Sequence, residues 1–137
     1  MFGLSKKADY GLELMLALAR NYSHGPSTSL RVKPLSLKKI AKEKKLPYKF
    51  LGQLASELRF GGLIEAKEGK SGGYFLTKPP KKISVAEVIE VLEGPVEFGH
   101  CFGCPKAKLC GQKDIWAEVG DKVKKTIEGK TLEDLIK

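Results

Sequence analysis

The stretch that decides the fold is LKKIAKEKKLPYKFLGQLASELRFGGLIEAKEGKSGGYFL, residues 37–76. Its first part predicts a short helix that ends near Lys44, because apolar residues recur there at helical spacing: Leu37, Ile40 and Ala41. A turn at Leu46-Pro47 follows, and Pro47 suits the first position of a second helix. That helix has leucines on one face: Leu51, Leu54 and Leu58. Two short helices joined by a tight turn predict a helix-turn-helix.

The second half of this stretch predicts a β-hairpin. Residues 63–67 and 73–76 have strand composition, and the segment between them, Glu68–Gly72, is rich in glycine. A hairpin directly after a helix-turn-helix is a wing. The tip contains Gly69-Lys70-Ser71, but a phosphate-binding P-loop needs a glycine where this chain has Ile64, so a nucleotide site is excluded.

Helices are predicted on both sides of this unit. Upstream, Ser5 can cap a helix over Ser5–Arg20, and residues 21–36 are predicted to form a loop. Downstream, Ser84 and Glu87 form a capping-box pattern that opens a helix ending at Gly94-Pro95. A last long helix, residues 114–128, has a narrow apolar seam that is typical of pairing with one partner helix: Trp116, Val119, Val123 and Ile127. By periodicity alone, that partner is equally well its own domain or a second chain.

The expected fold is therefore mostly α with a small β-hairpin wing, a winged helix-turn-helix followed by a long C-terminal dimerisation helix. We expect a DNA-binding domain over residues 1–80 and a dimerisation region over residues 81–137, with a cysteine sensing loop at about 96–113. No apolar run reaches the roughly 20 residues that cross a bilayer, and the N-terminus lacks a signal-peptide core, so a cytoplasmic protein without membrane contact is expected.

The charge of the chain favours a polyanionic partner. The formal net charge is +9, and between Glu13 and Glu57 one acid, Glu43, stands against nine basic residues. Such a concentrated basic field favours nucleic acid through phosphate contacts, although a lysine-rich solvated surface gives the same composition. No paired carboxylates, nucleophile–base pair or phosphate-binding loop can be placed, so an enzyme is not expected.

Three cysteines lie close together at Cys101, Cys104 and Cys110. An odd number of cysteines in a chain that is expected to be cytoplasmic argues for metal binding or redox chemistry and against a disulfide framework. Four interpretations remain open: an iron–sulfur cluster, which the thiolate count favours; zinc, which lacks a second ligand pair; a metal-free thiol switch; and cysteines that act as small hydrophobic residues.

The chain resembles the Rrf-type winged-helix regulators, a family of iron–sulfur, nitric-oxide and cysteine-metabolism repressors. The matching segments are Leu4-Ser5-Lys6, residues 48–63, Gly72–Leu76, Val88–Pro95, Trp116 and Thr131–Leu135. The resemblance implies a homodimer whose C-terminal helices cross and whose recognition helices contact the two half-sites of a palindromic double-stranded DNA. It departs from the family at Gly52 and Glu68, where glutamate and arginine respectively are common, and in the short Cys101–Cys104 interval.

The resemblance also suggests the DNA contacts. Gln53 matches a base-contacting glutamine, and a bidentate glutamine–adenine pair is physically sensible. Lys49 is expected to contact a phosphate or a guanine, and Lys70 to replace the missing wing arginine in the minor groove. Tyr48, like Phe50, is suited to base contact or to core packing. The remaining candidates are lysines of the basic stretch and of the wing: Lys38, Lys39 and Lys67.

The cysteines match, in the resemblance, the cluster ligands of the members that sense through iron and sulfur. A cluster needs a fourth ligand, and the chain has no fourth cysteine. Asp9 matches an acid that in some relatives reaches across from the other subunit, although a first-turn carboxylate also simply stabilises a helix N-terminus. His100 is the alternative. We therefore expect a regulator, most simply a repressor, that senses iron–sulfur, redox or nitric-oxide status; the alternative is a cluster-free regulator controlled by a partner protein or by thiol oxidation.

Overall fold

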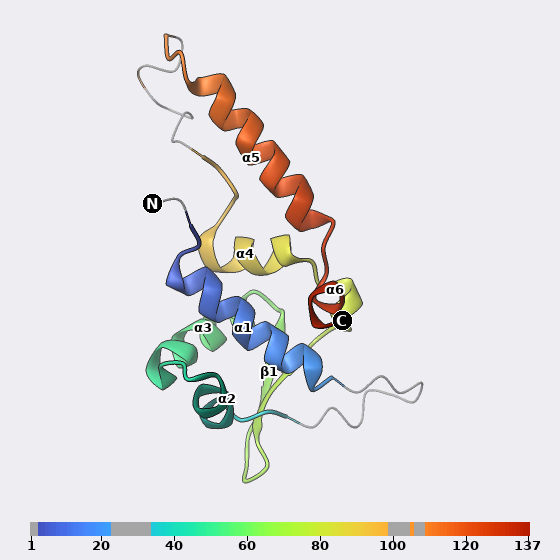
Figure 1. The fold of residues 1–137 in the computed structure, drawn as a ribbon. Helices are drawn as coiled ribbons and strands as arrows, with labels where there is room; N and C mark the ends of the chain where they lie inside the picture. The colour runs from blue at the N-terminus through green and yellow to red at the C-terminus, as the bar shows by residue number, and fades with distance from the viewer. Residues whose placement is uncertain (1–2, 23–33, 99–104, 106–108) are drawn as a thin grey trace.

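The computed structural model describes residues 3–22, 34–98, 105 and 109–137. In chain order the elements are α1 (Lys6–Arg20), α2 (Leu37–Lys44), α3 (Tyr48–Phe60), β1 (Ile64–Lys67), β2 (Gly73–Leu76), the 3-10 turn η1 (Pro80–Lys82), α4 (Val85–Glu93), α5 (Lys113–Glu128) and α6 (Leu132–Ile136). The predicted mostly α fold with one hairpin is confirmed. Figure 1 shows α1 at the centre, α2, α3 and the hairpin below it, α4 above it and α5 leaving the molecule as an arm.

The helix-turn-helix is made by α2 and α3. Lys45 ends α2 in the left-handed conformation, at φ 56°, and the Leu46 amide then donates to the Ala41 carbonyl over 2.9 Å. Pro47 was predicted to be the first residue of α3, and this is wrong by one position. Its ψ of 120° is extended, and its carbonyl accepts from the Leu51 amide, so Pro47 is the N-cap and α3 begins at Tyr48.

One core joins both halves of the chain. Its fully buried side chains come from α1, α2, α3, the hairpin, the residue that follows η1, α4 and α6: Leu14, Met15, Ile40, Leu51, Leu54, Leu58, Ile64, Ile83, Val88 and Leu132. The helix α1 contacts α3, α4 and α6. The leucines that the sequence assigns to one face of α3 are all buried here. Since α4 and α6 share the core of the winged unit, the functional division at residue 80 stays a prediction and is not a boundary of packing.

The wing is held along β2 by a third segment that the sequence did not reveal. The strands β1 and β2 are antiparallel, with Ile64 opposite Leu76 and Lys67 opposite Gly73. Leu35 pairs with Tyr74 through two backbone hydrogen bonds of 2.9 Å each. A Cβ on Gly73 would lie 2.5 Å from the Leu35 carbonyl carbon, so this position requires glycine. The wing is thereby fixed to the segment that leads into α2.

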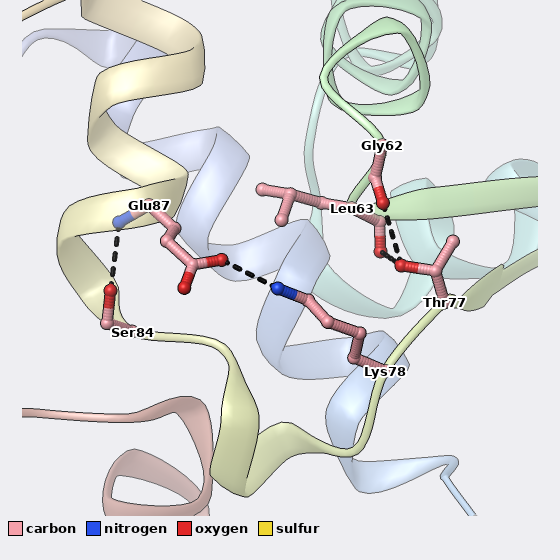
Figure 2. A network of polar contacts seen from close by, with 6 residues as sticks. All are labelled: Gly62, Leu63, Thr77, Lys78, Ser84 and Glu87. Carbon is pink, nitrogen blue, oxygen red and sulfur yellow. Dashed lines mark hydrogen bonds and ion pairs between the residues drawn. The ribbon is translucent and has the colours of Figure 1, made fainter.

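Polar contacts connect the exit of the wing to α3 and α4 (Figure 2). The Thr77 hydroxyl donates to the carbonyls of Gly62 and Leu63, over 2.7 and 3.2 Å. Lys78 Nζ lies 3.0 Å from Glu87 Oε2, and Ser84 Oγ accepts from the Glu87 amide over 3.1 Å. Only half of the capping box predicted at Ser84 forms, because the Glu87 carboxylate binds Lys78 instead of the Ser84 backbone.

The C-terminal end of the chain returns to the core through α6. Thr131 and Asp134 form a reciprocal capping box, and Ser84 and Thr131 are joined by an antiparallel bridge. Hydrogen bonds from the Thr131 amide and hydroxyl lower the pKa of the Asp134 carboxyl. This cap therefore stabilises the fold above the ordinary carboxyl pKa, and its contribution is lost as the pH falls through the lowered value.

Two helical glycines make a matched test of the packing between α1 and α4. A Cβ on Gly11 would lie 2.2 Å from Leu92 Cδ1, whereas a Cβ on Gly52 of α3 would meet nothing within 4 Å. We expect Gly11→Ala to destabilise the fold by about 1–3 kcal/mol through overpacking, and Gly52→Ala to stabilise it by up to about 1 kcal/mol. Urea unfolding of both variants measures this. Equal changes of the same sign would contradict the close approach of α1 and α4.

Candidate nucleic-acid interface

The outer face of α3 is exposed in the part of the chain that the structure describes. Lys49, Gln53 and Ser56 are exposed, whereas the leucines on the opposite face are buried in the core. Lys49 and Gln53 stand four residues apart, so their side chains point from the same face of the helix. This arrangement presents a cation and an amide together on a rigid helix, which is what base and phosphate contacts in a major groove require.

The two aromatic residues at the start of α3 have different environments. Phe50 packs against the core and meets Tyr10 of α1 edge to face, with ring centroids 5.7 Å apart. Tyr48 is 49% exposed, and Lys38 Nζ lies over its ring, 5.9 Å from the centroid. The core-packing alternative is therefore correct for Phe50. Tyr48 retains an exposed edge beside a lysine of α2.

The lysines proposed from the sequence are all exposed on the described surface. Lys38 and Lys39 are exposed in the first turn of α2, Lys67 is exposed at the end of β1, and Lys70 is exposed in the wing tip. The acidic Glu68 lies between the two wing lysines and is also exposed. Exposed lysines therefore lie on α2 and α3, within the basic stretch predicted from the sequence, and also on the wing.

Two contacts that the sequence did not reveal connect α3 to the end of α4. Lys7 Nζ of α1 lies 2.9 Å from Glu57 Oε1 of α3. Two residues earlier, the Ser5 hydroxyl, which caps α1 by accepting from the Ala8 amide, donates to Glu93 Oε1. Glu93 is the last residue of α4 and precedes the cysteine segment along the chain. The N-terminus of α1 therefore contacts both α3 and the C-terminal end of α4, which leads into the cysteine segment.

The structure describes only part of the predicted metal site. Cys110 has a half-buried free thiol and lies shortly before α5, and Asp9 is exposed in the first turn of α1. Cys101, Cys104 and His100 lie outside the described residues. Among the residues that are described, no three His, Cys, Asp or Glu side chains gather as a metal site, so the predicted ligand set stays a prediction.

Comparison with known proteins identifies the family. The sequence profile of the family described as "Rrf2: Iron-dependent Transcriptional regulator" matches residues 4–137, which is nearly the whole chain. The chain belongs to the Rrf2 family. It is thus a transcriptional regulator, and the resemblance described from the sequence is confirmed.

Individual relatives agree with this assignment. The chain is 35% identical over 132 residues to the HTH-type transcriptional regulator CymR of Bacillus subtilis, covering 96% of this chain and 88% of CymR. The solved structure of that protein, the global cysteine regulator, has a TM-score of 0.79 at 36% identity and covers 99% of this chain and 97% of its own.

Two further solved structures are similar. The IscR structure from T. potens has a TM-score of 0.78 at 31% identity, over 98% of this chain and 86% of that chain. The oxidised form of CymR from Staphylococcus aureus has a TM-score of 0.75 at 35% identity, over 99% of this chain and 97% of that chain. These relatives are transcription regulators rather than enzymes. Among the residues that the structure describes, no helix is long and apolar enough to span a membrane.

The arm of this Rrf2-family chain leaves its apolar seam half-exposed. Trp116, Val119, Val123 and Ile127 are all of intermediate exposure, and the one buried residue of α5 is Gly120, close to Phe98. In Figure 1 the N-terminal end of α5 stands away from the winged unit. A seam of this kind remains available for a second helix.

Proposed function

We propose that this protein is a homodimeric repressor that binds palindromic double-stranded DNA through α3 and the wing. The proposal rests mainly on the exposed face of α3, where Lys49 and Gln53 lie one turn apart, opposite a row of fully buried leucines. A helix supported in this way keeps its side chains in register with base edges. The exposed lysines of α2 and the wing suit the phosphates on either side of that face.

Each proposed contact follows from the chemistry of the side chain. Gln53 donates to and accepts from an adenine edge, and Lys49 contacts a phosphate or a guanine. Lys38, Lys39 and Lys67 neutralise backbone phosphates, while Lys70 at the wing tip enters the minor groove. Tyr48, held under Lys38, contributes its exposed edge to the same surface.

Gln53→Ala and Lys49→Ala separate base reading from phosphate binding. We expect Gln53→Ala to relax the preference at one base pair in each half-site by about 1–3 kcal/mol. We expect Lys49→Ala to weaken binding. A phosphate contact would lower the affinity for related sequences by similar factors and reduce the slope of log affinity against log salt, whereas a guanine contact would relax the preference at one base pair. Fluorescence anisotropy with duplexes selected from a random pool measures both. If Gln53→Ala lowered the affinity for all sequences equally, it would not read a base.

The apolar seam of α5 supports the proposal of a dimer. A two-fold dimer in turn supports the proposal that the DNA site is palindromic. Four apolar side chains at helical spacing are half-exposed on an arm that projects from the winged unit. Pairing two such arms buries their apolar surface, and each Å² of apolar surface that is buried stabilises the dimer by roughly 25 cal/mol. A two-fold dimer presents two recognition helices related by the same symmetry as the two halves of a palindrome.

The donor set of the cysteine segment fits an iron–sulfur cluster. Three thiolates within ten residues supply three of the usual four ligands, and Cys110, the one that the structure describes, has a free thiol. We propose Cys101, Cys104 and Cys110 as ligands, with Asp9 of the other subunit as the fourth and His100 as the alternative. When bound, the cluster would give this segment a ligation state that depends on iron supply, oxidants or nitric oxide.

A route for coupling this segment to DNA binding exists among the described residues. The segment follows Glu93, which accepts a hydrogen bond from Ser5 at the start of α1. From the same turn of α1, Lys7 pairs with Glu57 on α3. A shift of the cysteine segment that moves Glu93 therefore acts on the helix that positions Gln53 and Lys49, and a differential contact of this kind is what coupling between two sites requires.

A cluster-free thiol switch is the second candidate function. It is favoured by the half-buried free thiol of Cys110 and by the similarity to a regulator whose structure was solved in an oxidised form. Anaerobic purification at full iron supply separates the two candidates. A brown protein with thiolate-to-iron absorption supports the cluster, and a colourless protein whose DNA affinity changes on thiol oxidation supports the switch.

A further inference from the structure

The tip of the wing, Glu68–Gly72, is a short loop whose backbone is held at both ends. Lys67 and Gly73 are the last pair of the hairpin, and β2 is joined to the segment that leads into α2. Within the tip, the Gly72 amide donates to the Gly69 carbonyl over 3.0 Å. A Cβ on Gly72 would overlap the Lys67 carbonyl oxygen, so the chain turns tightly there. The side chains of the tip are therefore presented from a fixed backbone.

Glu68 is an unneutralised acid in a basic part of the molecule. It is exposed at the start of the tip, next to Lys67 and two residues before the exposed Lys70. Among the residues that the structure describes, its carboxylate has no ion pair or hydrogen bond. By contrast, the acids of α3 and β1 are paired with cations: Glu57 with Lys7, and Glu65 with Arg59. In Figure 1 the tip projects beyond α2 and α3, so this charge lies where the wing would meet DNA.

The minor groove of DNA offers a carboxylate two different environments. A run of A·T pairs narrows the groove, strengthens its negative potential and presents only acceptor atoms, so a carboxylate is repelled and has no donor to bind. A G·C pair adds the guanine N2 amino group, which is a hydrogen-bond donor in the minor groove. A lone cation prefers the first environment. A carboxylate beside that cation shifts the preference towards the second.

We propose that Glu68 makes the wing prefer a minor groove that contains G·C pairs and reject a narrow, A·T-rich one. The inference rests on the proposed function, in which the wing tip of each subunit enters the minor groove. Glu68 accepts a hydrogen bond from a guanine N2 amino group. Lys70 enters the same groove and offsets the repulsion between this carboxylate and the flanking phosphates.

This role makes Glu68 a second determinant of specificity, beside the recognition helix. Gln53 is proposed to read a base in the major groove, where all four base pairs can be distinguished. The minor groove separates only A·T from G·C pairs, so the wing adds a coarser preference at neighbouring positions. The DNA site is then defined at two places in each half-site, one for α3 and one for the wing.

Inosine substitution in the DNA tests this contact with the full chain. A duplex is first selected from a random pool with the wild-type protein, and each guanine is then replaced in turn, in both half-sites, with inosine. Inosine lacks the N2 amino group but keeps the major-groove edge of guanine. At one guanine in each half-site, we expect inosine to lower the affinity of the wild-type protein by about five-fold or more and that of Glu68→Ala by less than about two-fold.

A second selection gives an independent readout of the same preference. With Glu68→Ala, duplexes selected from the same random pool should carry A·T pairs in place of the G·C pairs at this position, because the remaining lysines favour a narrow groove. Glu65→Ala is the matched control. It removes an exposed acid from the same hairpin, but from β1 beside Arg59 and not from the tip. It should keep the wild-type response to inosine and the wild-type selected sequence.

The outcomes separate this role from DNA binding itself. If no guanine distinguished the wild-type protein from Glu68→Ala, or if Glu68→Ala changed the affinity for all duplexes by one common factor, the inference would be overturned and the proposed function would stand. In that case Glu68 would act only as a uniform repulsive charge or as a solvated surface acid. If the wild-type protein selected no duplex at all, the proposed function would be overturned, and this inference with it.

Discussion

Replacing Val119 and Val123 with glutamate is expected to turn the protein into a monomer and to lower its affinity for a palindromic duplex by about 100-fold or more, since one recognition helix cannot bridge two half-sites. Both valines are half-exposed on the seam of α5. Each buried valine contributes roughly 1.5–3 kcal/mol, and a glutamate in its place also carries a charge into the interface. Sedimentation velocity and anisotropy titrations measure the two effects.

Point substitutions are a cleaner test than truncation before Asp114. Truncation would also remove α6, whose Leu132 is fully buried in the core of the winged unit, and would unfold that unit. Lys125→Glu is the control, because Lys125 is exposed and lies on the opposite side of α5 from Val123. It should leave the dimer intact. If the double variant still sedimented as a dimer, the seam would not be the dimer interface.

The second large effect is expected at the cysteines. Cys104→Ala should abolish the visible thiolate-to-iron absorption of the anaerobic protein, since two thiolates and one weaker ligand hold a cluster poorly. Asp9→Ala should keep a perturbed spectrum but lose the dependence of DNA affinity on the cluster. A carboxylate is a harder, weaker iron ligand than a thiolate, and Asp9 is exposed on α1, beside the residues that contact α3 and α4.

These two variants also decide the fourth ligand. An unchanged spectrum together with unchanged coupling in Asp9→Ala would leave Asp9 as an ordinary first-turn carboxylate of α1, and His100→Ala would then be the variant that perturbs the spectrum. A full spectrum in Cys104→Ala would exclude Cys104 from the ligand set.

Periodicity in the sequence predicted the elements and most of the core. Leu51, Leu54 and Leu58 are buried as their spacing indicates, and Ser5 caps α1 as predicted. Such features are local, because the 3.6-residue repeat and the capping residues act within one or two turns. The cysteine segment and the basic stretch could also be predicted, since residue types and their spacing are read directly from the sequence.

Contacts between distant parts of the chain could not be predicted in this way. Ser5 and Glu93 are 88 positions apart, and neither their bond nor the Lys7–Glu57 pair leaves a periodic trace in the sequence. For the same reason only half of the capping box at Ser84 forms, because the Glu87 carboxylate pairs with Lys78. The pairing of Leu35 with Tyr74 was not predicted, because the prolines and serines of residues 21–36 indicate a loop. These are the contacts that position the proposed interface.

The central claim is that a DNA-binding dimer changes its affinity when the ligation state of its three cysteines changes. The most direct test is an anaerobic anisotropy titration of one selected duplex with a single preparation, before and after its iron is removed by chelation. The account predicts a brown starting protein. It also predicts a change in affinity of about 5- to 150-fold, which is the change that typical coupling free energies between two linked sites produce. A protein that is colourless at full iron supply, or equal affinities before and after chelation, would contradict it.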